Sequence, residues 1–319
     1  MTTTASGSGA HGASAARTAA HLGGGRDVDG PAVTVRGLVK RYGDKLAVDH
    51  LDLTIAHGEV FALLGPNGAG KTTTVEILEG YRRRDAGEVD VLGGDPATGG
   101  AAWRSQLGVV LQSSTENAEL TVEEFVRHFA RYYPAPRDPD EVIEVVGLAE
   151  KRRARTRSLS GGQRRRLDVA LGIIGNPRLL FLDEPTTGFD PEARRAFWQL
   201  VRTLRGEGTT ILLTTHYLDE VEQLADRVAV IADGRLRALD VPAHLGGRHA
   251  HQARVRWTED GAPREVTSAT PTSVVAELSA RLGGEVPDLQ VVRPSLEDVY
   301  LDLIGSGGTT VDLTTEAAR

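Results

Sequence analysis

A glycine-rich loop between an apolar run and a helix-forming segment constrains this chain more than any other feature of its sequence. The apolar run covers residues 60–64, and the loop after it has the spacing G-x-x-x-x-G-K-[ST]. Small residues in such a loop let backbone N–H groups surround phosphates at the positive end of the next helix. The predicted phosphate-binding residues are Gly65, Pro66, Asn67, Gly68, Ala69, Gly70, Lys71, Thr72 and Thr73.

Two side chains of this loop predict a nucleotide with a bound metal ion. Lys71 is expected to reach the β- and γ-phosphates, and the Thr72 hydroxyl is expected to be one ligand of Mg²⁺. The alternative is a glycine-rich turn without a ligand. It would require Lys71 and Thr72 to occur at this spacing by coincidence.

Composition and charge exclude several classes of protein. The net charge of -7 argues against general binding to nucleic acid, and the absence of cysteine excludes disulfides and thiolate metal sites. The longest apolar stretch, residues 167–182, is interrupted by Asn176, Pro177 and Arg178, so we expect no membrane span. Residues 1–30 are rich in Ala, Gly, Ser and Thr without an apolar core, which predicts a disordered tail rather than a signal peptide.

Strand and helix patterns alternate along most of the chain, which predicts an α/β fold with a mostly parallel sheet. Two strand patterns, residues 33–39 and 47–55, precede the loop and predict a small antiparallel sheet. Composition changes at residues 241–251, so we expect a disordered tail (1–30), a nucleotide-binding domain (31–240), a small C-terminal α+β extension (241–305) and a second flexible tail (306–319).

Capping signals mark a helical section in the middle of the chain. The sequence 121–124 has the form of a capping box and opens a helix whose apolar face continues to Tyr133. A second short helix is expected over residues 138–146. A second capping box, Ser160 with Gln163, predicts a helix that continues to about Ile174.

Carboxylates at the end of a buried strand complete a predicted hydrolytic site. Asp183 follows the apolar run 179–182 and is expected to hold Mg²⁺ opposite Thr72, while Glu184 can accept a proton from an attacking water. His216 and Gln112 each end another apolar strand pattern. His216 could sense the γ-phosphate or hold Glu184, and Gln112 could reach Mg²⁺ or the water, although each also has an ordinary structural interpretation.

These motifs together resemble the nucleotide-binding subunits of ATP-binding cassette (ABC) transporters. The match covers about residues 33–239, and its most specific element is the signature Ser160, Gly161, Gly162 and Gln163. The resemblance implies that the protein binds ATP and Mg²⁺ in a phosphate-loop NTPase cassette with an antiparallel β subdomain and a helical signature subdomain. It also implies a head-to-tail homodimer, in which the signature of one copy closes over the ATP of the other.

The signature also has a physical interpretation of its own. Ser160 and the N–H groups of Gly161 and Gly162 form an anion site at a helix start, which calls for a γ-phosphate from a partner. Two glycines in the first turn of a helix cost roughly 1 kcal/mol each in helix stability. A helix cap alone would not require glycine at these positions. We expect Arg164, Arg165 and Arg166 to be solvated or paired with carboxylates.

The resemblance assigns roles to further residues. Tyr42 is implied to stack on adenine, with an ordinary sheet-edge tyrosine as the alternative, and Asp190 is implied to lie at the dimer seam. Catalytic roles fall to Glu184, His216, Gln112 and Lys71. The chain departs from the family pattern at Phe189, where leucine is common.

Two less specific stretches, residues 116–121 and 294–300, look like the subgroup that energises ABC-2 type exporters, including daunorubicin-resistance ATPases. This resemblance implies a peripheral subunit at the cytoplasmic face of the membrane, docked through the section 112–157 on ABC-2 type integral membrane permease subunits. The expected cargo is a hydrophobic compound such as a drug or antibiotic. The alternatives are a regulatory ABC ATPase that acts on ribosomes or nucleic acid, and an importer subunit.

Overall fold

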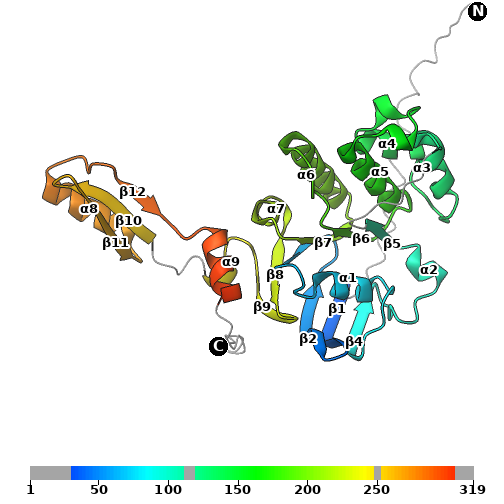
Figure 1. Cartoon of the computed structure of the whole chain (residues 1–319), viewed down its shortest axis with the longest axis horizontal. Coiled ribbons are helices and arrows are strands. Elements are labelled where there is room, and N and C mark those ends of the chain that lie inside the picture. Colours follow the sequence, from blue (N-terminus) through cyan, green and yellow to red (C-terminus); the bar gives the residue numbers. More distant parts are fainter. Residues whose placement is uncertain (1–29, 111–118, 248–252, 306–319) are drawn as a thin grey trace, which may run out of the picture. The chain divides into compact units, whose positions relative to one another are not determined.

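The computed structural model describes residues 30–110, 119–247 and 253–305, and its centre is a six-stranded sheet with the strand order β5-β6-β7-β3-β8-β9 (Figure 1). All neighbouring strands are parallel except the pair β8 and β9, which forms a hairpin. The strands are β3 (Val60–Leu64), β5 (Leu107–Val110), β6 (Leu179–Asp183), β7 (Thr210–Thr215), β8 (Arg227–Ala232) and β9 (Arg235–Asp240).

The central strands β3, β6 and β7 are buried along their whole length and mostly apolar, because both faces of the sheet are covered. In β3, Val60, Ala62 and Leu64 belong to one hydrophobic core, while Phe61 and Leu63 belong to the other. Successive side chains of a strand point to opposite faces, so one short apolar run contributes to both layers.

An antiparallel sheet with the order β2-β1-β4 contributes to the second core, together with the first helix. These elements are β1 (Val33–Tyr42), β2 (Lys45–Ile55), β4 (Ala86–Val91) and α1 (Lys71–Leu78). A short helix, α2 (Ala101–Arg104), adds Trp103, whose indole Nε1 donates to the Val91 carbonyl at 2.8 Å. The sheet predicted before the loop is therefore confirmed, and β4 joins it from beyond the loop.

The first core combines the opposite face of the central sheet with helices from the rest of the chain. These helices are α3 (Val122–Ala130), α4 (Pro139–Val145), α5 (Gly161–Ile174), α6 (Pro191–Gly206) and α7 (Leu218–Leu224). Single 3₁₀ turns occur at Ala149–Lys151, Thr156–Ser158 and Leu245–Gly247. The predicted α/β fold with a mostly parallel sheet is confirmed.

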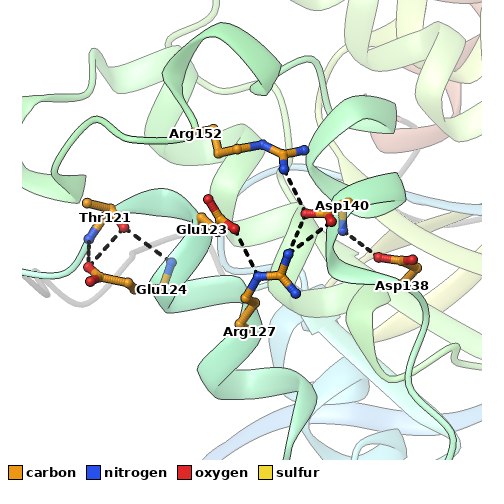
Figure 2. A network of polar contacts seen from close by, with 7 residues as sticks. All are labelled: Thr121, Glu123, Glu124, Arg127, Asp138, Asp140 and Arg152. Atoms are coloured by element: carbon orange, nitrogen blue, oxygen red, sulfur yellow. Dashed lines mark hydrogen bonds and ion pairs between the residues drawn. The ribbon is translucent and has the colours of Figure 1, made fainter.

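A polar network holds the helical section together (Figure 2). Arg127 of α3 donates to Glu123 at 3.0 Å and to both oxygens of Asp140 in α4, and Arg152 donates to the same carboxylate at 2.8 Å. The capping box predicted at Thr121 is present. An individual exposed ion pair contributes little to the free energy of unfolding. We therefore interpret this network as fixing the orientation of α3 relative to α4.

Backbone bonds connect the start of α3 to the segment that leads into Ser160. The N–H groups of Val122 and Glu123 donate to the carbonyls of Ala154 and Arg152 at 3.1 and 3.0 Å. The N–H of Thr156 donates back to residue 120 at 3.0 Å. The approach to the signature is therefore fixed to the first turn of α3.

The C-terminal part contains a three-stranded sheet, one helix that packs with it, and a final helix. Its elements are β10 (Ala253–Glu259), β11 (Ala262–Ser268), α8 (Pro271–Leu282), β12 (Gln290–Val292) and α9 (Leu296–Gly305). Val255, Leu278 and Val286 form the small core of this sheet and α8. In α9, Leu296 and Val299 belong instead to the first core of the cassette. None of the helices in the described ranges is long and apolar enough to cross a membrane.

Candidate nucleotide-binding and hydrolysis site

The phosphate loop leaves β3 after Leu64 and enters α1 at Lys71, as predicted. Gly70 has φ 104°, and a Cβ atom there would lie 2.3 Å from the carbonyl oxygen of Ala47. A Cβ at Gly65 would lie 2.2 Å from the carbonyl oxygen of Ile231. Glycine is required at both positions because the backbones of β2 and β8 support the loop from behind.

Lys71 is buried beneath this loop. Its ammonium group donates to the carbonyl oxygens of Gly65 at 2.8 Å and Pro66 at 3.2 Å. Burial lowers the pKa of Lys71, and the negative charges of Glu184 and Asp183 oppose this effect. The side chain is thus held as a cation between the loop and the acidic end of β6.

A cavity of about 350 Å³ opens above the loop. It brings together Tyr42 and most of the predicted phosphate-binding residues of the loop, and its lining is Tyr42, Lys45, Ala47, Asn67, Gly68, Gly70, Lys71, Thr72, Thr73 and Glu184. Tyr42 is 40% exposed, and the cations of Lys40 and Arg82 lie 5.5 and 5.3 Å from its ring centre. An aromatic ring, hydroxyl groups, a lysine and a carboxylate therefore share one cavity.

The carboxylates at the end of β6 are fixed by the neighbouring strand β7. Thr214 donates its hydroxyl to Asp183. The N–H of Glu184 donates to the carbonyl and to the hydroxyl oxygen of Thr214, both at 3.1 Å. Glu184 has φ 43°, which is rare for a residue other than glycine and often marks a functional turn.

His216 lies beside Glu184, as the sequence suggested. Its Nδ1 is 3.3 Å from Glu184 Oε1, within the range of an ion pair. Nδ1 makes no hydrogen bond among the described residues. The ring also contacts that of Tyr217, with 4.1 Å between centres.

The signature residues lie in a second cavity, also of about 350 Å³, lined by Ser160, Gly162, Gln163, Arg166, Gly188, Phe189, Asp190, Glu192 and Ala193. The reciprocal capping box of Ser160 and Gln163 is present, and Asp190 caps α6 by accepting from the N–H of Ala193 at 2.7 Å. Phe189 turns inward against Phe197. The signature residues Ser160, Gly162 and Gln163 therefore lie next to Asp190 of the same subunit.

The glycines of the signature differ from those of the phosphate loop. A Cβ at Gly161 would meet nothing within 4 Å, and one at Gly162 would meet only the Cβ of Ala193, at 3.9 Å. Packing within the described chain does not require either glycine. The N–H groups of Gly161 and Gly162 belong to the first turn of α5, and the N–H groups of a first turn have no hydrogen-bond acceptors within their own helix.

Of the three arginines after the signature, Arg165 is not solvated. It is buried, and it donates to the carbonyl oxygens of Pro185 at 3.0 Å and Asp183 at 2.8 Å. Burial lowers its pKa, although nearby carboxylates oppose this. Arg165 therefore supports the backbone that carries Asp183 and Glu184, a tertiary contact that spacing in the sequence does not reveal.

Gln112 and residues 116–118 lie outside the described residues, so the roles predicted for them stay predictions. Within the described ranges, no group of three or more His, Cys, Asp or Glu side chains is arranged to hold a metal ion. Thr72 and Asp183 offer hard oxygen donors, but these two side chains alone would not surround a metal ion. Such a site suits Mg²⁺, which keeps water and phosphate oxygens as ligands.

Sequence analysis missed Glu79, at the end of α1. Burial raises the pKa of Glu79, and the negative charges of Asp183 and Glu76 add to this effect, so that the pKa reaches about 8. Its Oε1 is buried and has no hydrogen-bond partner among the described residues. We therefore expect Glu79 to carry a proton near neutral pH.

The raised pKa of Glu79 predicts a pH-dependent stability. The usual pKa of a glutamate is 4.5, so between pH 4.5 and about pH 8 the folded state keeps a proton on Glu79 that the unfolded chain releases. The free energy of unfolding therefore falls as the pH rises through this range. We expect Glu79→Gln to be close to wild type at pH 5 and more stable by about 2–4 kcal/mol at pH 8. Urea unfolding at both pH values measures this, with the exposed Glu88→Gln as control. A constant difference between variant and wild type would contradict the assignment.

The fold and the first cavity define a phosphate-loop NTPase, and a second cavity lies at the start of α5. The family profile described as "ABC transporter" matches residues 48–187. The chain is 40% identical over 303 residues to the daunorubicin resistance ATP-binding protein DrrA3 of Streptomyces coeruleorubidus, with 86% of this chain and 96% of the relative covered. It is 39% identical over 299 residues to the Nod factor export ATP-binding protein I of Rhizobium meliloti, with 86% and 88% covered.

Solved structures share the fold. An ATP-binding subunit of an ABC transporter superposes with a TM-score of 0.62 at 22% identity, over 85% of this chain and 99% of that one. A cassette in a dimeric post-hydrolysis state with ADP and phosphate gives 0.60 at 23% identity, over 66% and 98%.

The chain belongs to the ATP-binding subunits of ABC transporters, in the group that includes the daunorubicin-resistance and Nod factor export proteins. The resemblance to exporter ATPases inferred from the sequence is confirmed. The protein is accordingly an exporter-type ABC ATPase that binds and hydrolyses ATP.

Proposed function

We propose that this protein powers the efflux of a hydrophobic compound, such as a drug or antibiotic, by closing head to tail with a second copy around ATP. The signature carries this proposal. Gly161 and Gly162 would form an anion site at the start of α5, and packing among the described residues does not require a glycine at either position. A γ-phosphate bound to the other copy is the ligand that fits such a site.

The residues around the first cavity fit distinct roles in hydrolysis. Lys71 would bind the β- and γ-phosphates, and Tyr42 would stack on adenine. Thr72 and Asp183, with Gln112 as a predicted third ligand, would hold Mg²⁺, which neutralises charge on the phosphates when bound. Glu184 would accept a proton from the attacking water, and His216, 3.3 Å away, would orient this carboxylate.

The proposed partners are ABC-2 type integral membrane permease subunits. The names of the relatives support this, since they describe proteins of drug resistance and of Nod factor export. We propose that the protein binds at the cytoplasmic face of the membrane through the helical section. That section contacts the signature approach through Val122 and Glu123, so closure on ATP would be transmitted to the permease as a rigid-body movement.

The variant Glu184→Gln provides the test. It is expected to bind ATP and to close without hydrolysis, because the amide cannot accept the proton from water. A tagged form of this variant is purified in the presence of ATP from detergent-solubilised membranes of the native host. We expect a multi-span membrane protein to co-purify with it and to be identified by mass spectrometry. Lys71→Ala, purified in parallel, is the control that cannot close. Recovery with ribosomes, nucleic acid or only soluble proteins would contradict the exporter proposal and favour a regulatory ATPase.

A further inference from the structure

Glu220, in the first turn of α7, is a carboxylate that the predicted site does not include. It is 1% exposed. The Thr186 hydroxyl donates to its Oε1, and Thr215 forms a second side-chain hydrogen bond with it. Burial raises the pKa of Glu220, while these hydrogen bonds and the positive charge of Arg194 oppose the shift.

The two threonines place Glu220 between the turns that carry the proposed hydrolytic residues. Thr186 comes two residues after Glu184, in a turn closed by the N–H of Thr187, which donates to the Glu184 carbonyl at 3.3 Å. Thr215 directly precedes His216, and its hydroxyl accepts from the N–H of residue 217 at 2.9 Å. One carboxylate therefore connects the end of β6 with the end of β7.

Further polar groups gather at this point between α6 and α7. The Arg194 guanidinium lies 5.1 Å from the ring centre of Tyr217. Three buried side-chain atoms of the cluster, Glu220 Oε2, His216 Nδ1 and Arg194 Nε, have no hydrogen-bond partner among the described residues. Arg194 belongs to the first turn of α6, which Asp190 caps.

A purely structural anchor is the competing interpretation of this cluster. Buried polar atoms without partners cost stability, and an apolar side chain of similar volume at position 220 would avoid that cost. The cluster also contacts both turns of the hydrolytic site and the start of α6. These observations favour a role in the reaction.

We propose that Glu220 is a positioning residue that holds Glu184 and His216 in register for hydrolysis, and that its charge links this pair through Arg194 to the start of α6. This proposal rests on the roles assigned to Glu184 and His216 above. Glu220 is not among the residues that line the first cavity. It acts through Thr186 on one turn and through Thr215 on the other.

Steady-state ATPase kinetics of the full chain test this proposal. Glu220→Gln keeps an oxygen that can accept from Thr186 but removes the charge, so we expect kcat to fall about tenfold while KM for ATP stays within about twofold. Glu220→Ala removes both interactions and should fall about a hundredfold in kcat. Glu222→Gln, an exposed carboxylate of the same helix, is the matched control and should behave as wild type.

The outcomes separate this inference from the proposed function. Wild-type kcat in Glu220→Gln would overturn the role of Glu220, even if Glu220→Ala fails to fold. A parallel loss of kcat and of folded protein, measured by circular dichroism, would make Glu220 a structural anchor only. If Glu184→Gln hydrolyses ATP at the wild-type rate in the same assay, the assignment of Glu184 itself fails, whatever Glu220→Gln does.

Discussion

Lys71→Ala is expected to weaken ATP binding about a hundredfold and to reduce hydrolysis below about 1% of wild type. The ammonium group is buried under the loop and is the closest fixed positive charge to the phosphate positions. Isothermal titration with ATP and a phosphate-release assay measure the two effects. The unfolding temperature without nucleotide should change little, because removing a buried charge also removes its desolvation cost. The increase in unfolding temperature that ATP is expected to cause in the wild-type protein should be absent in Lys71→Ala.

Lys45→Ala is the matched control for this prediction. Lys45 lines the same cavity, but it is exposed to solvent, which screens its charge. We expect a change in ATP affinity of less than about fivefold. Equal effects of Lys45→Ala and Lys71→Ala would mean that the cavity attracts the nucleotide by general charge. Wild-type affinity in Lys71→Ala would contradict the phosphate-loop assignment.

Gly161→Asp is expected to abolish hydrolysis by preventing closure between two copies. The new side chain has open space around it, and an aspartate in the first turn of α5 favours the helix, so the variant should fold and bind ATP as wild type does. Its negative charge would face the γ-phosphate of the other copy. We expect a loss of more than about a hundredfold in kcat and no ATP-dependent dimer in analytical ultracentrifugation.

The neutral variant Gly161→Asn separates charge from size, because asparagine has nearly the same volume as aspartate. A clearly smaller loss in Gly161→Asn would identify repulsion of an anion as the cause. If Gly161→Asp still dimerises with ATP and hydrolyses it, the signature does not serve a second copy in this protein.

The sequence predicted most elements because their signals are local. The strands around the phosphate loop are short apolar runs bounded by glycine, proline or charged residues, and the short helix predicted over residues 138–146 is α4 (Pro139–Val145). The loop itself was predictable because its function fixes residue types at fixed spacing. In contrast, β11 was missed. Its side chains are mostly exposed, and it contains Pro263, so it has neither apolar alternation nor typical strand composition.

The environments of three titratable side chains could not be predicted for a different reason. Arg165 and Glu220 are buried and Glu79 is half-buried by contacts that include residues remote in the sequence, and nothing in their local pattern distinguishes them from solvated side chains. Only the tertiary structure brings Thr186 and Thr215 together around Glu220. The sequence therefore supplied the groups expected to contact ATP, while the structure supplied those that support them.

The position of α9 has a consequence for how the protein is made. Leu296 and Val299 complete the same core that contains the central sheet, and a Cβ at Gly246 would lie only 2.6 Å from Val299 Cγ1. The cassette thus obtains part of its own core from residues that the ribosome adds about sixty positions after β9. The nucleotide-binding part can reach its final packing only after Leu296 and Val299 have been synthesised. A stop codon between residues 240 and 296 would leave apolar surface of the cassette uncovered in the nascent chain.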